Sequence, residues 1–251
     1  MSEEVSYKKH FHRFLQAEPE RLHFAAHSHH YWPDVTFEAQ QDCWRDAARL
    51  VDRKWAHVLG EVLPEVQGLI AKHLGLADAA TLTFAPNTHD FVRRLLSALP
   101  PGGPPRMLST DGEFHSFARQ TARLEEDGLV VMTRVPVEPF VDFTARFVAA
   151  ARAEDFDLIF FSQVFFNSGF ALTQLDELVA ALPDDPLLVV DGYHGFLARP
   201  TDLGSIATRA FFLAGGYKYA MTGEGACFLH APPGVAPRPG DTGGHTAFGA
   251  T

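Results

Sequence analysis

The chain has 251 residues, 46% of them hydrophobic, so it can bury a sizeable core and its composition excludes intrinsic disorder. It carries 21 basic against 31 acidic residues, and the net charge of −10 argues against nucleic acid or an anionic membrane as a partner. The two cysteines, an N-terminus without an apolar signal core and the lack of a membrane-length apolar stretch favour a cytoplasmic protein that binds a small molecule.

The first third of the chain has helical periodicity. Residues 36–59 place apolar side chains such as Trp44 and Trp55 on one face, and residues 61–74 repeat the pattern with Val62, Val66 and Leu69. We therefore expect residues 1–80 to form an N-terminal segment with long helices that pack on a large domain spanning residues 81–251.

From residue 81 onward, short apolar runs alternate with helical segments. These runs predict seven strands, at residues 81–84, 106–110, 129–135, 157–164, 187–191, 209–214 and 226–230. Several runs are apolar on successive residues, as in Leu158–Phe161, which indicates strands covered on both faces. We predict an α/β domain with a mostly parallel seven-stranded sheet between helix layers, whose ligand site lies at the carboxyl ends of the strands.

Asp191 and Lys218 each follow the end of a predicted strand, 27 residues apart. A carboxylate there can keep a pyridine nitrogen protonated, and a lysine amine of depressed pKa can condense with an aldehyde. Together they are what pyridoxal phosphate requires. The alternative for each residue is ordinary: an aspartate that forms a turn or caps a helix, and a solvated surface lysine.

Other strand ends supply further candidates for the same cofactor. Asn87 or Thr88 can cap a helix whose free amides would bind a phosphate, although ordinary capping explains the pattern equally. Phe114 or His115 can lie flat on a cofactor ring, or can pack in the core. Gln163 can donate to the ring's 3-oxygen, or can belong to a satisfied turn.

Three strings make the pattern specific: Ser162-Gln-Val followed by Asn-Ser-Gly169, Val190-Asp-Gly-Tyr-His194-Gly, and Gly216-Tyr-Lys-Tyr-Ala-Met-Thr-Gly-Glu-Gly-Ala226. They resemble the fold-type-I pyridoxal-phosphate enzymes of the class V aminotransferase superfamily, and kynureninase within it. The similarity runs from about residue 21 to the end of the chain. The segment Leu22–Ser28 also resembles a kynureninase segment, with His27 in place of its asparagine.

The resemblance implies a role for each matching residue. Lys218 would form the Schiff base and move protons at the substrate α-carbon, Asp191 would pair with the pyridinium, and His194 would lie near the ring. The other cofactor contacts that it implies are Asn87, Thr88 and Tyr217 at the phosphate, Phe114 or alternatively His115 on the ring face, Gln163 at the 3-oxygen, and Thr222 in the phosphate site of a partner subunit.

For function, the resemblance implies an enzyme that acts on a small amino-acid substrate through an external aldimine and a carbanion, as a homodimer. Kynureninase-like hydrolytic C–C cleavage is the first expectation. An aminotransferase, a cysteine desulfurase-like enzyme and a non-catalytic scaffold that binds the cofactor remain open. Cys43 and Cys227 fall in helical and strand contexts, which counts against desulfuration by a loop cysteine.

Two absences are also expected. Class V enzymes continue into a small C-terminal domain that carries a carboxylate-binding arginine, and this chain ends at Thr251 where a segment around His245 resembles the approach to that domain. We therefore expect the small domain to be absent. His23, His27, His29 and His30 lie close in sequence but have no partner cluster of cysteines, so we expect no metal site.

Overall fold

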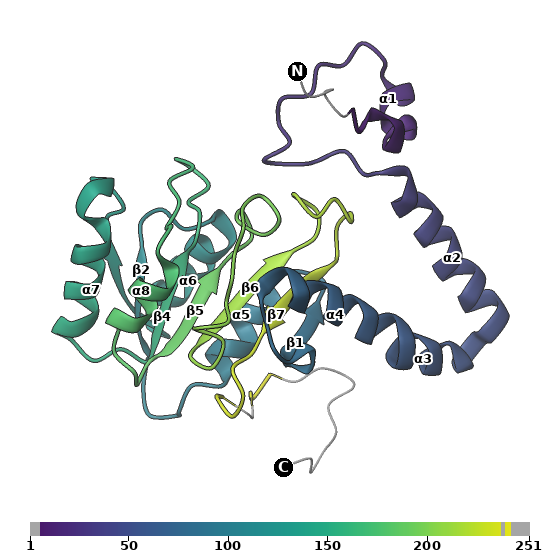
Figure 1. The fold of residues 1–251 in the computed structure, drawn as a ribbon. Coiled ribbons are helices and arrows are strands. Elements are labelled where there is room, and N and C mark those ends of the chain that lie inside the picture. The colour runs from purple at the N-terminus through teal and green to yellow at the C-terminus, as the bar shows by residue number, and fades with distance from the viewer. Residues whose placement is uncertain (1–5, 237–238, 242–251) are drawn as a thin grey trace.

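The computed structural model describes residues 6–236 and 239–241, and a single sheet forms its centre (Figure 1). The strands are β1 (Leu82–Ala85), β2 (Arg106–Thr110), β3 (Val131–Val135), β4 (Leu158–Ser162), β5 (Leu187–Asp191), β6 (Ala210–Gly215) and β7 (Cys227–His230). They are ordered β1-β7-β6-β5-β4-β2-β3, and β7 runs antiparallel to the other six strands. The predicted mostly parallel seven-stranded sheet is confirmed, with strand ends displaced by at most two residues.

Helices cover both faces of this sheet. The helices α5 (Thr88–Ser97) and α6 (His115–Glu126) pack on one face, whereas α7 (Phe143–Ala153), α8 (Leu175–Ala181) and α4 (Leu63–Leu74) pack on the other. In β4, Leu158 and Phe160 belong to the first layer, and Ile159 and Phe161 to the second. The Phe160 ring stacks on Phe117 of α6 with centroids 3.8 Å apart. Two buried faces explain why successive residues of the strand are apolar.

The N-terminal helices depart from the prediction. They are α1 (His12–Ala17), α2 (Asp34–Leu50), α3 (Lys54–His57) and α4. A short 3-10 turn at Val51–Arg53 joins α2 to α3, and a π-helical turn at Val58–Val62 joins α3 to α4. Only α4 packs on the sheet, through Ala71 and Leu74 and through a hydrogen bond from Gln67 Nε2 to the carbonyl of Leu82 (2.7 Å).

Helices α2 and α3 extend away from the sheet, and neither buries a residue (Figure 1). The expectation that both predicted helices pack on the large domain is therefore corrected for residues 34–57. The sequence periodicity identified the apolar face of α2 and α3, but it contains no information on what covers that face. None of the helices within the described ranges combines the length and the apolar character that crossing a bilayer requires.

Candidate active site

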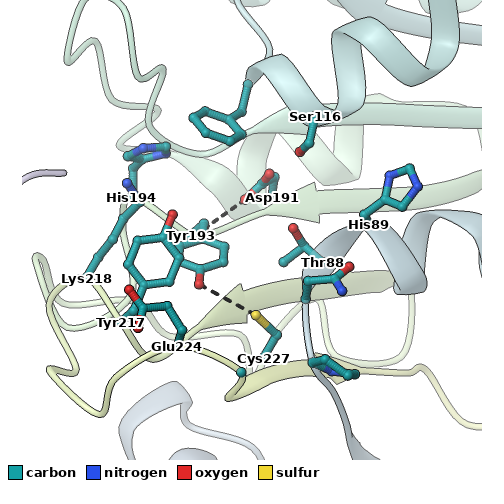
Figure 2. A pocket seen from close by; sticks show the side chains of 14 residues that line it. Thr88, His89, Ser116, Asp191, Tyr193, His194, Tyr217, Lys218, Glu224 and Cys227 are labelled. Atoms are coloured by element: carbon teal, nitrogen blue, oxygen red, sulfur yellow. Dashed lines mark hydrogen bonds between the residues drawn. The ribbon is translucent and has the colours of Figure 1, made fainter. Parts of the chain in front are cut away.

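The carboxyl ends of the parallel strands border a cavity of about 340 Å³, the site that the sequence predicts. Seven of the ten predicted site residues line it: Asn87, Thr88, Phe114, Asp191, His194, Tyr217 and Lys218 (Figure 2). They lie at or just after the ends of four strands, β1, β2, β5 and β6. The sheet thus brings together residues up to 131 positions apart in the sequence, from Asn87 to Lys218.

Asp191 and Lys218 meet because β5 and β6 are parallel neighbours, with Asp191 opposite Leu213 in the register. Asp191 is 8% exposed, and its Oδ1 accepts from the backbone N–H of Tyr193 (2.9 Å). Burial raises the pKa of Asp191 to about 6, although the Lys218 cation opposes the rise. Lys218 is 5% exposed, and burial lowers its pKa against the opposing charge of Asp191. Burial therefore shifts Lys218 toward its neutral form, which is the nucleophilic form.

Aromatic rings surround the Lys218 amine. The centroids of Tyr217, Phe114 and Tyr193 lie 5.1, 5.9 and 5.9 Å from Nζ. The His194 ring lies 5.8 Å from that of Phe114. Burial lowers the pKa of His194 to about 4, and the nearby Lys218 and His27 side chains contribute to the lowering, so this imidazole is neutral at physiological pH.

The opposite end of the cavity is suited to an anion. Helix α5 begins at Thr88, and the Asn87 side chain caps it by accepting from the Asp90 N–H (2.9 Å). The first-turn amides and the positive end of the helix favour negative charge at this place. Figure 2 shows Thr88 and His89 on one side of Asp191, with His194 and Lys218 on the other. The cavity therefore accommodates a ligand with an anionic group at α5 and a reactive group at Lys218.

Residues 27–32 of the N-terminal segment contact Lys218, Tyr217 and the loop that follows them. Lys218 Nζ donates to the backbone carbonyl of His27 (3.2 Å). The His29 ring stacks on Tyr217 with centroids 5.5 Å apart, and Trp32 lies against Gly223, on the loop that follows Lys218. The sequence linked this segment to the site only through its resemblance to kynureninase.

Three predicted residues lie outside the cavity. The His115 side chain is exposed at the start of α6 and contacts Phe166, so Phe114 is the aromatic residue that faces the cavity. The Gln163 amide donates to Thr201 Oγ1 (3.0 Å) and borders a different hollow, because the chain turns back after β4 through the bridge between Val164 and Ala171.

Thr222 is exposed on the loop after Lys218, where its hydroxyl lies beside Gly216 rather than in the cavity. Its assignment to the phosphate site of a partner subunit stays a prediction. The segment around His245, expected to lead toward a small domain, lies outside the described residues. Within the described part of the chain, no three His, Cys, Asp or Glu side chains gather as a metal site requires.

The sequence did not identify several residues of the site. Tyr193 lies between Asp191 and His194, and its hydroxyl is 3.5 Å from the Sγ of Cys227, which also lines the cavity. Glu113 is 3% exposed beneath the cavity wall. The signal for Tyr193 was its place inside the Asp-x-x-His string. For Glu113 the only signal was an acid beside a strand end, a position in which most acids are solvated.

We compared the chain with known proteins. No family model matches it, and no curated protein matches it closely enough to report. Solved structures do match. A mutant of C-DES with glycine covalently linked to its PLP cofactor has a TM-score of 0.77 and 17% identity, over 91% of this chain and 60% of that chain. The cystine C–S lyase C-DES in complex with its product cysteine persulfide has a TM-score of 0.71 and 18% identity, over 83% of this chain and 56% of that chain.

The apo cysteine desulfurase from Thermococcus onnurineus NA1 has a TM-score of 0.67 and 16% identity, over 93% of this chain and 58% of that chain. This chain thus spans about 60% of the length of the first of these structures. At these identities the likeness concerns the fold alone. The chain has the fold of the large domain of fold-type-I pyridoxal-phosphate enzymes.

Proposed function

We propose that the protein is a pyridoxal-phosphate-dependent enzyme that acts on an amino acid. The observation that carries this proposal is the arrangement of Asp191 and Lys218, two buried groups of opposite type that open onto one cavity at the ends of adjacent parallel strands. The fold that this chain shares with C-DES supports the proposal independently.

The residues of the cavity fit the parts of the cofactor. Its volume of about 340 Å³ falls within the range of small-ligand sites. Asp191 suits the pyridine nitrogen, Lys218 suits the aldehyde, and the amides at the start of α5 beside Thr88 suit the phosphate. Phe114 offers a flat apolar surface for the ring. Bound pyridoxal phosphate would supply an aldehyde that condenses with amines and a ring that withdraws electrons from the substrate α-carbon.

The protein would position and protonate the reacting groups. Ionised Asp191 would hold the proton on the ring nitrogen by a charge-assisted hydrogen bond. Lys218 would hold the cofactor at its aldehyde carbon and would take and return a proton at the substrate α-carbon. Neutral His194 would serve as a hydrogen-bond partner near the ring. Because its pKa is depressed, it would place no positive charge beside Lys218. Tyr217 would reach the phosphate from the rim, as the sequence resemblance implies.

Two outcomes of the reaction are proposed. Kynureninase-like hydrolytic C–C cleavage is the first candidate because the Asp-x-x-His and Tyr-Lys-Tyr strings resemble those of kynureninase. C–S cleavage is the second candidate because the matched structures include a cystine C–S lyase and a cysteine desulfurase. A persulfide on the protein itself fits poorly: Cys43 is exposed on α2, away from the cavity, and burial raises the pKa of the Cys227 thiol, which weakens it as a nucleophile. A lyase that releases sulfur from the substrate needs neither thiol.

Borohydride labelling tests the cofactor. The purified chain is incubated with pyridoxal phosphate, reduced and digested, and the modified lysine is located by mass spectrometry. We expect the label on Lys218, its loss in Lys218→Met, and an unchanged result in Lys72→Met, which removes an exposed lysine of α4. A label spread over surface lysines, or retained in Lys218→Met, refutes the proposal.

Product analysis then separates the candidate reactions. The loaded protein is mixed in turn with kynurenine, with cystine, and with an amino donor plus a keto acid. Release of alanine from kynurenine supports C–C cleavage, release of a persulfide or sulfide from cystine supports C–S cleavage, and a new amino acid from the keto acid supports transamination. A spectral change with each amino acid and no product identifies binding without turnover.

A further inference from the structure

Glu113 is a buried acid beside the site to which no role has been assigned above. It is 3% exposed and immediately precedes Phe114. Its Oε1 accepts from the Thr110 hydroxyl (2.6 Å) and from the Ser162 N–H (3.2 Å), and its Oε2 lies 2.6 Å from the Ser162 hydroxyl. Thr110 ends β2 and Ser162 ends β4, so Glu113 joins the ends of two neighbouring strands.

A charge on Glu113 would have no cation beside it. None of the ion pairs among the described residues includes Glu113. The groups that face Glu113 are the Thr110 and Ser162 hydroxyls and the carboxyl of Asp191. Lys218 is the cation near Asp191. Burial raises the pKa of Glu113 to about 8, although the hydrogen bonds from Ser162 and Thr110 oppose the rise, and the charge of Asp191 adds to it. Two acids in one buried region compete for ionisation in this way.

The hydrogen bonds of Glu113 suit the protonated acid. Two groups donate to Oε1, and a carbonyl oxygen has the two lone pairs needed to accept both. The neighbour of Oε2 is the Ser162 hydroxyl, which can accept a hydrogen bond from the O–H of a protonated acid. A glutamine side chain would reproduce this pattern, with its amide N–H donating to Ser162. Because Ser162 pairs with Asp191 in the register, its position also fixes the backbone next to Asp191.

We propose that Glu113 keeps its proton at neutral pH and is a positioning residue of the site. As a neutral acid it holds the ends of β2 and β4 in place, and it leaves Asp191 as the ionised member of this buried pair of carboxyls. That Asp191 then meets a pyridine nitrogen rests on the function proposed above. The proton on Glu113 belongs to the protein itself and is present without the cofactor.

The test compares thermal unfolding of the cofactor-free wild type, Glu113→Gln and Glu113→Ala from about pH 5 to pH 9. The Tm of the glutamine variant is expected to equal that of the wild type near pH 5 and to exceed it increasingly up to about pH 8. The reason is that the folded wild type keeps a proton on Glu113 that its unfolded chain releases over this range, so rising pH destabilises the wild type alone. The alanine variant, which loses the hydrogen bonds, is expected to be less stable than the glutamine variant at every pH. A Tm difference between Glu113→Gln and wild type that does not change with pH overturns the proposal.

An infrared measurement keeps the proposal testable even if Glu113→Gln fails to fold. In Asp191→Asn, Glu113 is the remaining acid of the pair, and we expect the C=O band of a protonated carboxyl at about pH 6, a pH at which solvated carboxyls are ionised. Absence of the band overturns the proposal. Neither measurement contains pyridoxal phosphate, so a wild-type chain that fails to bind the cofactor refutes the proposed function and leaves this result intact.

Discussion

Replacing Asp191 with asparagine is expected to stabilise the cofactor-free chain and to remove its hold on the cofactor. Burial raises the pKa of Asp191 from its ordinary value of 3.8 to about 6. A carboxyl with a raised pKa in the folded state stabilises the fold while it is protonated, below the unfolded pKa, and that contribution is lost as pH rises through the folded pKa. Ionised Asp191 therefore destabilises the folded chain at neutral pH.

The size of this effect follows from the shift. At about 1.4 kcal/mol per pKa unit, keeping Asp191 ionised costs the fold roughly 3 kcal/mol above pH 6. Asparagine retains an oxygen that can accept from the Tyr193 N–H, but its amide needs a partner of its own and Lys218 loses a neighbouring charge. We expect a net gain of about 1 to 2 kcal/mol at pH 7.5 and no gain near pH 4.

The assay is urea unfolding of wild type and Asp191→Asn at both pH values, with cofactor retention measured after gel filtration at pH 7.5. Asp185→Asn, which removes an exposed acid just before β5, controls for the loss of one charge from a chain of net charge −10. The reasoning is refuted if Asp191→Asn is no more stable than wild type at pH 7.5, or if the gain is equal at both pH values. Undiminished cofactor retention would instead exclude Asp191 as the partner of the ring nitrogen.

Three further substitutions test local features, each by urea unfolding. Gly192→Ala is expected to destabilise the fold by about 1 to 3 kcal/mol, because a Cβ there would lie 1.9 Å from the ring of buried Phe212; an unchanged midpoint would show that the ring can move aside. Its matched control is Gly68→Ala in α4, where no heavy atom lies within 4 Å of the new Cβ and a gain of roughly 0.5 to 1 kcal/mol is expected. Asn87→Ala is expected to cost about 1 kcal/mol, because the Asp90 N–H loses its cap, and to weaken cofactor retention; retention at the wild-type level would place the phosphate elsewhere.

The sequence was sufficient to predict that Asp191 and Lys218 converge on one cavity, because parallel strands impose a simple geometry. Apolar runs such as Leu158–Phe161 identify doubly covered strands, and the carboxyl ends of parallel neighbours fall on one edge of the sheet. Asp191 and Lys218 therefore converge although 27 residues separate them. The strand-end rule requires no knowledge of side-chain packing, which is why it succeeded for these two residues.

Where the outcome depends on tertiary contacts, the sequence was insufficient. Gln163 follows β4 as directly as the rule demands, yet the chain turns back after it and its amide reaches Thr201. Trp44 lies on the apolar face of a well-formed helix, but it is 73% exposed because α2 extends away from the sheet. Periodicity indicates which face of a helix is apolar, and the strand pattern indicates where a loop begins. Neither states what packs against the side chain.

Hydrogen bonds to the backbone keep the Lys218 and Asp191 side chains from pairing with each other. A lysine and an aspartate in one buried cavity would normally form an ion pair and neutralise each other. Among the described residues no ion pair joins them: Lys218 Nζ donates to the carbonyl of His27, and Asp191 accepts from the backbone of Tyr193. Because separate backbone groups hold the two side chains apart, burial can lower the pKa of Lys218 and raise that of Asp191. The amine is thereby left free for an aldehyde and the carboxylate for a cationic ring nitrogen, which is the division of roles that the proposed chemistry requires.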